Sequence, residues 1–191
     1  MASLTSTFIT PEEYLERERL AETKSEYYRG EMFAMAGTSL AHATIITNLV
    51  RELSNRLKSG PYDVFSGDLR LNIPATGLYT YPDVMVVCGG PALTDSHFDT
   101  VTNPVVLIEV LSESTKNYDR GQKFENYRTI PSLMEYVTVA QDRAHVEVWT
   151  RQPGNGWLLK ETDGAAALSL PSIGVELPLS EIYLKVDLPV A

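Results

Sequence analysis

Hydrophobic and polar residues alternate along this chain with two different periods. Between residues 39 and 57 the apolar positions recur every three or four residues, which predicts an amphipathic helix that ends before Gly60-Pro61. Elsewhere, short runs rich in apolar and β-branched residues predict strands. These runs cover residues 62–73, 81–88, 104–111 and 133–139.

The remaining elements follow from caps and turn residues. Thr10, Pro11 and Glu13 form the pattern of a helix start with a capping box, which predicts a helix over 10–20. A further helix is predicted at 118–129, between the third and fourth strands. The other predictions are a hairpin at 26–35 that turns at Arg29-Gly30, a loop at 89–103, a second hairpin at 145–150 and 157–161, and a helical turn at 179–183.

The order of the central elements is therefore αβββαβ. We expect a mixed α/β fold with an N-terminal helix and hairpin and a C-terminal hairpin. The length of 191 residues and the hydrophobic content of 43% suit a single domain over residues 1–191 with a real core.

Two carboxylates stand in strands that otherwise read as buried, Asp83 within 81–87 and Glu109 within 105–111. An ionised carboxylate in such a run costs several kcal/mol unless something pairs with it, and a divalent cation would meet that need. Strand side chains alternate, so Asp83 shares a face with Met85 and Val87, and adjacent strands could bring the two carboxylates together. Oxygen ligands favour Mg²⁺ or Mn²⁺, and the three histidines have no spacing that favours zinc.

The helix after Glu109 carries Asp119, Lys123 and Tyr127 at i, i+4 and i+8, close to one face. One interpretation is a solvated Asp119–Lys123 pair worth about 0.3 to 0.5 kcal/mol. The other is a lysine that stabilises developing negative charge or orients an attacking water. We expect Lys123 to point toward the same pocket as the two strand carboxylates if the second interpretation holds.

Charge limits the partners that we expect. The net charge of −9 argues against nucleic-acid binding by bulk electrostatics, so any phosphate contact must be local. Cys88 is the single cysteine and is predicted to be a buried thiol, which fits a reducing compartment. The first ten residues lack a basic leader pattern and no apolar run approaches about 20 residues, so we expect a cytoplasmic protein with no membrane partner.

Together these residues resemble the Uma-two family of restriction-endonuclease-like proteins in the PD-(D/E)XK nuclease superfamily. The resemblance rests on Pro82-Asp83, Glu109-Val110-Leu111-Ser112, Asp119, Lys123 and Tyr127, with Gly30-Glu31, Met35 and His42 similar to the family's N-terminal pattern. It implies a restriction-endonuclease-like core and a metal held by Asp83, Glu109 and the carbonyl of Val110. It also implies that Glu31 is a further acidic residue. The superfamily's lysine usually lies two residues after the acidic residue, where this chain has Leu111, so the resemblance assigns that role to Lys123.

We therefore expect a Mg²⁺- or Mn²⁺-dependent endonuclease that hydrolyses nucleic-acid phosphodiester bonds, with DNA as the expected substrate and a homodimer as a way to cut two strands. Two alternatives stay open. One is a non-catalytic interaction domain that keeps the fold, and the other is a phosphoesterase that acts on small nucleotides. Taken singly, several residues have structural interpretations: Glu31 as a hairpin surface charge, His42 as a capping or packing residue, Asp68 as a turn residue, and Phe124 and Tyr127 as core.

Overall fold

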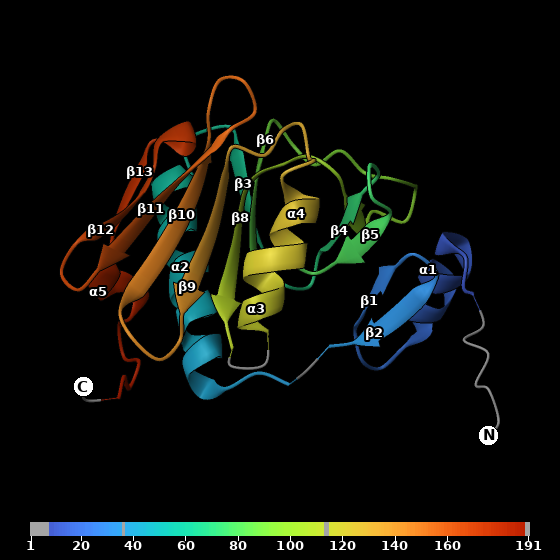
Figure 1. The fold of residues 1–191 in the computed structure, drawn as a ribbon, viewed down its shortest axis with the longest axis horizontal. Coiled ribbons are helices and arrows are strands. Elements are labelled where there is room, and N and C mark those ends of the chain that lie inside the picture. Colours follow the sequence, from blue (N-terminus) through green and yellow to red (C-terminus); the bar gives the residue numbers. More distant parts are fainter. Residues whose placement is uncertain (1–7, 36, 113–114, 190–191) are drawn as a thin grey trace.

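The fold is described from a computed structural model that covers residues 8–35, 37–112 and 115–189. Its largest described sheet has six strands (Figure 1), with β8 parallel to β9 and the other neighbours antiparallel. The strand order is β11 (Trp157–Asp163), β10 (His145–Arg151), β9 (Glu135–Ala140), β8 (Pro104–Leu111), β6 (Val84–Cys88) and β3 (Tyr62–Ser66).

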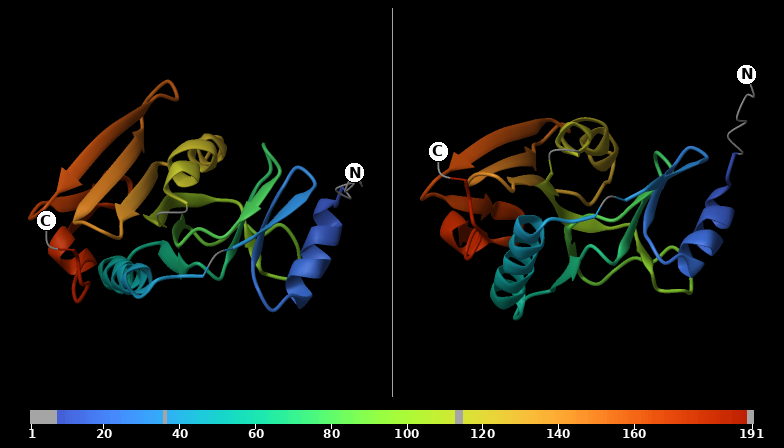
Figure 2. Two further views of the ribbon diagram at one scale, coloured as in Figure 1. Left: turned by 60° about the horizontal axis from the view of Figure 1, so that its bottom comes forward. Right: turned by 90° about the horizontal axis from the view of Figure 1, so that it is seen from below.

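Different helices cover the two faces of this sheet (Figure 2). One face packs on α2 (Leu40–Leu57), and it includes Val84 and Val86 of β6. The other face includes Met85 and Val87 and packs on a helical segment made of α3 (Lys116–Tyr118), the π-helix η1 (Asp119–Lys123) and α4 (Phe124–Tyr127). Alternate apolar side chains of β6 therefore pack into two separate hydrophobic cores, one on each face of the sheet, because adjacent strand side chains point to opposite faces.

A second sheet lies beside the first and carries the N-terminal helix α1 (Pro11–Leu20) at its outer end (Figures 1 and 2). Its strand order is β2 (Glu31–Ala34), β1 (Ser25–Tyr28), β5 (Leu78–Thr80), β4 (Arg70–Ile73) and β7 (Thr100–Val101). The predicted capping box is present, because Thr10 and Glu13 bond each other's backbone N–H. Tyr14 of α1 stacks on Tyr27 of β1, which fixes the helix to the sheet.

The C-terminal segment packs against α2 and completes the hydrophobic core on that face of the six-stranded sheet. It forms a small antiparallel pair, β12 (Ala167–Leu170) and β13 (Val175–Pro178), joined by the 3₁₀ turn η2 (Pro171–Ile173) and followed by α5 (Leu179–Ile182). Leu168, Leu177 and Ile182 are fully buried there. Only the helical turn of this region was predicted from the sequence.

The predicted αβββαβ order is confirmed: it runs α2, β3, β6, β8, the helical segment 116–127 and β9. The prediction of one strand at 62–73 is wrong. The chain turns at Gly67 and Asp68, so β3 enters the six-stranded sheet and β4 enters the other. The predicted loop at 89–103 contains β7, and β5 was not predicted.

The prediction that Cys88 is buried is also wrong, because its side chain is exposed. Cys88 is the last residue of β6, after four buried positions, and the chain turns away at Gly89 and Gly90, both with positive φ. The strand thus ends beyond the layers that cover its other residues. Within the described ranges, no helix has the length and apolar character needed to cross a membrane.

Candidate active site

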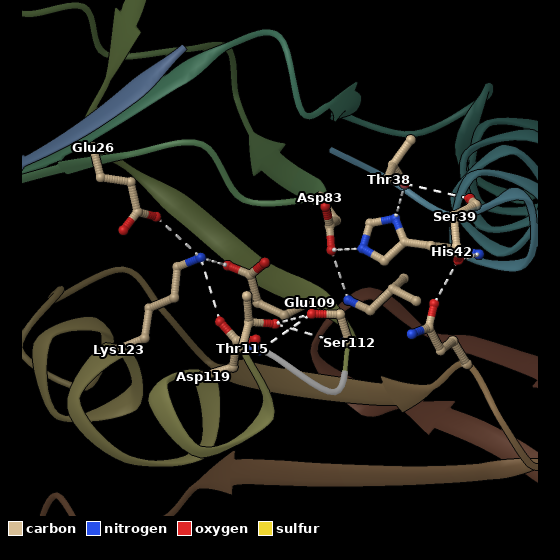
Figure 3. A network of polar contacts seen from close by, with 12 residues as sticks. Glu26, Thr38, Ser39, His42, Asp83, Glu109, Ser112, Thr115, Asp119 and Lys123 are labelled. Atoms are coloured by element: carbon tan, nitrogen blue, oxygen red, sulfur yellow. Dashed lines mark hydrogen bonds and ion pairs between the residues drawn. The ribbon is translucent and has the colours of Figure 1, made fainter. Parts of the chain in front are cut away.

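A cleft of about 1210 Å³ opens at the ends of β6 and β8. The N-terminal half of α2, the segment around η1 and the β1–β2 hairpin all contribute to its lining. The polar network of this cleft is drawn in Figure 3. Asp83, Glu109, Val110 and Lys123, which the sequence predicted to act together, all line it.

The antiparallel register of β6 and β8 brings Asp83 and Glu109 together. The ladder ends with the pair Val84 and Ile108, and Glu109 follows Ile108 in β8. Asp83 lies in the bend just before β6 and is only partly buried, so the prediction that it stands within a buried strand is wrong. Asp83 Oδ2 also accepts a hydrogen bond of 2.7 Å from the Val110 N–H, which holds its carboxylate at this edge.

Glu109 is buried, with 3% of its surface exposed. Its Oε1 accepts a hydrogen bond of 2.6 Å from the Tyr127 hydroxyl and lies 3.0 Å from Lys123 Nζ. Burial raises the pKa of Glu109 from its ordinary 4.5 to about 8; Lys123 acts against this rise, and Asp83 adds to it. A buried carboxylate with this pKa favours either a proton or a second cation.

Lys123 lies at the centre of three carboxylates (Figure 3). Its Nζ is 3.0 Å from Glu109 Oε1, 3.3 Å from Glu26 Oε1 and 3.5 Å from Asp119 Oδ1. Burial lowers the pKa of Lys123, but the surrounding carboxylates outweigh it and raise that pKa well above its ordinary value. The interpretation of Asp119 and Lys123 as a solvated pair is wrong, because both are buried.

Lys123 and Asp119 delimit the single π-helical segment of the described chain. Such segments often occur at functional sites, where the wider turn re-aims side chains. Arg120 anchors the segment from its other side through a two-pronged contact with Glu147 of β10, at 2.9 and 2.7 Å. The helix that carries Lys123 is therefore tied to the sheet that carries Glu109.

Glu147 also belongs to a second group of possible metal ligands. His145, Glu147 and Glu161 offer atoms within 4.8 Å of one another. However, Arg120 already neutralises Glu147, and Glu161 is exposed. Among the described residues, no such group of three includes Asp83 or Glu109.

Glu26, rather than Glu31, joins the cluster from the hairpin. Glu26 is buried, contacts Lys123 and accepts a hydrogen bond of 3.1 Å from the Tyr118 hydroxyl. Glu31 pairs with Tyr28 at the turn end of the hairpin, is exposed and does not line the cleft. Glu26 was not predicted from the sequence. Adjacent side chains of a strand point to opposite faces, so Glu26 points away from the face of β1 on which Tyr27 is buried.

His42 was interpreted from the sequence as a capping or packing residue, and the structure shows a further contact. Its backbone N–H completes the Ser39 cap at 3.1 Å, but its side chain reaches the cleft, with Nε2 3.3 Å from Asp83 Oδ2 and Nδ1 2.8 Å from Thr38 Oγ1. Burial lowers the pKa of His42, whereas Asp83 and the carbonyl of Val110 raise it, and the net direction is upward. The interpretation as a purely structural histidine is therefore incomplete.

The mixed sheet, the αβββαβ order, and Asp83 and Glu109 at the adjacent ends of β6 and β8 define a restriction-endonuclease-like protein. A solved structure supports this fold: a protein from Anabaena variabilis titled "a putative nuclease belonging to DUF820" aligns with a TM-score of 0.74 at 19% identity, over 92% of this chain and 97% of that one.

The chain belongs to the Uma2 family, described as "Putative restriction endonuclease", whose model matches residues 11–180. It is similar to two uncharacterized proteins of Synechocystis sp. (strain ATCC 27184 / PCC 6803 / Kazusa). The protein sll1609 is 41% identical over 167 residues, which cover 87% of this chain and 94% of the relative. The protein slr1290 is 34% identical over 175 residues, which cover 92% and 91%. The family resemblance predicted from the sequence is confirmed.

Proposed function

We propose that this protein is a metal-dependent endonuclease that hydrolyses phosphodiester bonds in nucleic acid. The observation that carries the proposal is that Asp83, Glu109 and Lys123 line one cleft. Asp83 accepts a hydrogen bond of 2.7 Å from the N–H of Val110, the residue after Glu109, and Lys123 lies 3.0 Å from Glu109. Membership of a family described as a restriction endonuclease supports the same reaction class.

The donor atoms fit a hard divalent cation. Asp83 and Glu109 supply carboxylate oxygens and Val110 supplies a carbonyl, which is the set that Mg²⁺ or Mn²⁺ prefers. Both described contacts to Glu109 reach Oε1, which leaves Oε2 as the oxygen to face the ion. Three carboxylates, those of Glu26, Glu109 and Asp119, surround Lys123, and Asp83 lies in the same cleft beside His42. The carboxylates around Lys123 outnumber it, which favours a further cation.

The bound ion would polarise the scissile phosphate and lower the pKa of a water molecule for in-line attack. The water gives up a proton to solvent as its oxygen forms a bond to phosphorus, the ester P–O bond breaks, and the leaving oxygen takes up a proton from solvent. Lys123 stabilises the negative charge that develops on the phosphate oxygens. Tyr127 holds Glu109 in place, while Glu26 and Asp119 hold Lys123.

A cleavage assay on mixed DNA and RNA tests the proposal. The wild type should cleave with Mg²⁺ or Mn²⁺ and not with a chelator, and Asp83→Ala should lose cleavage while it stays folded. Glu31→Gln is the control, since it removes an acidic residue of the β1–β2 hairpin that does not line the cleft, and it should keep full activity.

Absence of cleavage by the folded wild type under every metal condition would reject the endonuclease and favour the non-catalytic interaction domain. Hydrolysis of nucleotides without cleavage of polymers would instead identify a small-nucleotide phosphoesterase. The proposal includes DNA as a substrate and a homodimer for double-strand cutting. Sedimentation of the purified protein measures the oligomeric state.

A further inference from the structure

The basic side chains of the cleft are already engaged. Among the described lining residues, Lys24 donates to the Gly67 carbonyl at 2.8 Å and to Asp68. Arg51 pairs with Glu52 at 3.0 Å, and Lys123 is buried among carboxylates. Duplex DNA is bound chiefly through Lys and Arg contacts along its phosphates. This cleft offers no such track, so the substrate must be recognised in another way.

The hairpin end of the cleft is aromatic and apolar instead. Phe33 and Met35 line it from β2 and the residue after it, and they remain 48% and 37% exposed. Phe33 and Met35 are two positions apart and therefore share one face of this segment. Among the described strands β2 lies at the edge of its sheet, beside β1. Exposed apolar side chains gathered inside a cleft mark a binding position more often than isolated ones on a surface do.

The hairpin register fixes where this apolar end lies. Phe33 pairs directly with Glu26, so both side chains stand on the same face of the hairpin with Cβ atoms about 5 Å apart. The Glu26 carboxylate in turn lies 3.3 Å from Lys123 Nζ, which is 3.0 Å from Glu109. An aromatic side chain therefore stands beside Glu26, one of the carboxylates that contact Lys123.

We propose that the substrate is single-stranded nucleic acid, with an unpaired base stacked on Phe33 and the neighbouring phosphate at the Asp83–Glu109 pair. The inference rests on the proposed function and adds its substrate class, in place of double-strand cutting by a homodimer. A base in a duplex is stacked between its neighbours and cannot enter the cleft, whereas an unpaired base stacks on an aromatic side chain whatever its sequence. The acidic protein then needs only one local phosphate contact, which matches its net charge of −9.

Binding measurements test this. Fluorescence anisotropy would compare labelled oligothymidine and oligouridine strands of about ten nucleotides with a blunt duplex of the same length, both with a chelator and with Mg²⁺. The wild type should bind either single strand more tightly than the duplex. Phe33→Ala should weaken single-strand binding by about tenfold, because one stacked base contributes about one decade of affinity. Phe33→Trp should retain binding.

Phe98→Ala is the matched control, since Phe98 is 73% exposed but does not line the cleft. It should bind like the wild type, and melting curves check that each variant is folded. Equal affinities of Phe33→Ala and Phe98→Ala, a duplex bound as tightly as the single strands, or no binding of single strands would each overturn the inference. A difference between the two single strands would show whether DNA or RNA is preferred.

The two proposals fail separately. Metal-dependent cleavage of a duplex that does not depend on Phe33 would overturn the substrate class and leave the endonuclease intact. Single-strand binding through Phe33, without hydrolysis under any metal condition, would reject the endonuclease and support the binding position.

Discussion

Replacing Glu109 with Gln should stabilise the metal-free protein at alkaline pH and abolish metal-dependent cleavage. The folded state holds the pKa of Glu109 at about 8, against an ordinary value of 4.5. Between these two values the folded protein binds more protons than the unfolded chain. Stability therefore falls as the pH rises through this window, and this part of the fall is absent when residue 109 cannot ionise.

The magnitude follows from the shift. Each pH unit inside the window costs at most about 1.4 kcal/mol. Between pH 6 and pH 8 the free energy of unfolding of the wild type should fall by about 2 kcal/mol relative to Glu109→Gln. For a chain of this size that difference corresponds to about 4 to 8 °C in Tm. At pH 6 the two proteins should be closer in stability, because Glu109 is then largely protonated in the folded state.

Chemical denaturation in a chelator at several pH values measures this difference, and the cleavage assay with Mg²⁺ measures the loss of function. Glu135→Gln is the matched control. Glu135 is also a buried strand glutamate whose pKa burial raises, but it bonds Ser172 outside the cleft. This variant should keep both cleavage and the increase in Tm that Mg²⁺ produces.

Parallel pH profiles for the wild type and Glu109→Gln would refute the electrostatic reasoning, because they would mean that Glu109 does not carry the proton. Full cleavage by Glu109→Gln would separately remove Glu109 from the metal ligands. Denaturation therefore tests the effect on stability, and the cleavage assay tests the role of Glu109 as a metal ligand.

Two further variants probe the groups around Glu109. Lys123→Met should lower the free energy of unfolding at neutral pH by about 3 to 5 kcal/mol, since it leaves buried carboxylates without their shared cation. Chemical denaturation measures this change. A decrease no larger than that caused by replacing a surface lysine such as Lys160 would contradict the prediction. Tyr127→Phe removes the hydroxyl that donates to Glu109 Oε1 at 2.6 Å and should cost about 1 to 2 kcal/mol. It should also weaken Mg²⁺ binding, measured by titration calorimetry, and an unchanged Kd would argue against this positioning role.

The sequence predicted those features that have a local signature. The helical period of 39–57 is strong and its helix is observed at Leu40–Leu57. Asp83 and Glu109 were recognisable because each interrupts an apolar run. The structure pairs β6 with β8 in an antiparallel register, which brings the two residues to the same edge. Lys123 was recognisable because it follows Glu109 on a helix in the expected order.

The features that depend on tertiary contacts were not predictable. The run at 62–73 has strand-like residues throughout, and its division between two sheets becomes evident only when Lys24 bonds the turn at Gly67 and Asp68. His42 lies 41 positions before Asp83 in the sequence and has no local pattern that links the two. Glu31 drew attention because it follows the turn, but the hairpin's register puts Glu26 at the cluster.

Asp83 and Glu109 both have basic partners in this fold, but Lys123 does not offset the burial of Glu109, whose pKa stays raised. Lys123 lies beside Glu109 and His42 lies beside Asp83, so each carboxylate has a basic partner at 3.0 and 3.3 Å. Those partners do not balance Glu26 and Asp119 as well. In the proposed function, a divalent cation takes over the neutralisation of Glu109, and Lys123 becomes available to a phosphate oxygen while Glu26 and Asp119 keep it in position. Without a metal, the excess of carboxylates in the cleft repels a phosphate. With a divalent cation bound to those carboxylates, the same cleft attracts a phosphate.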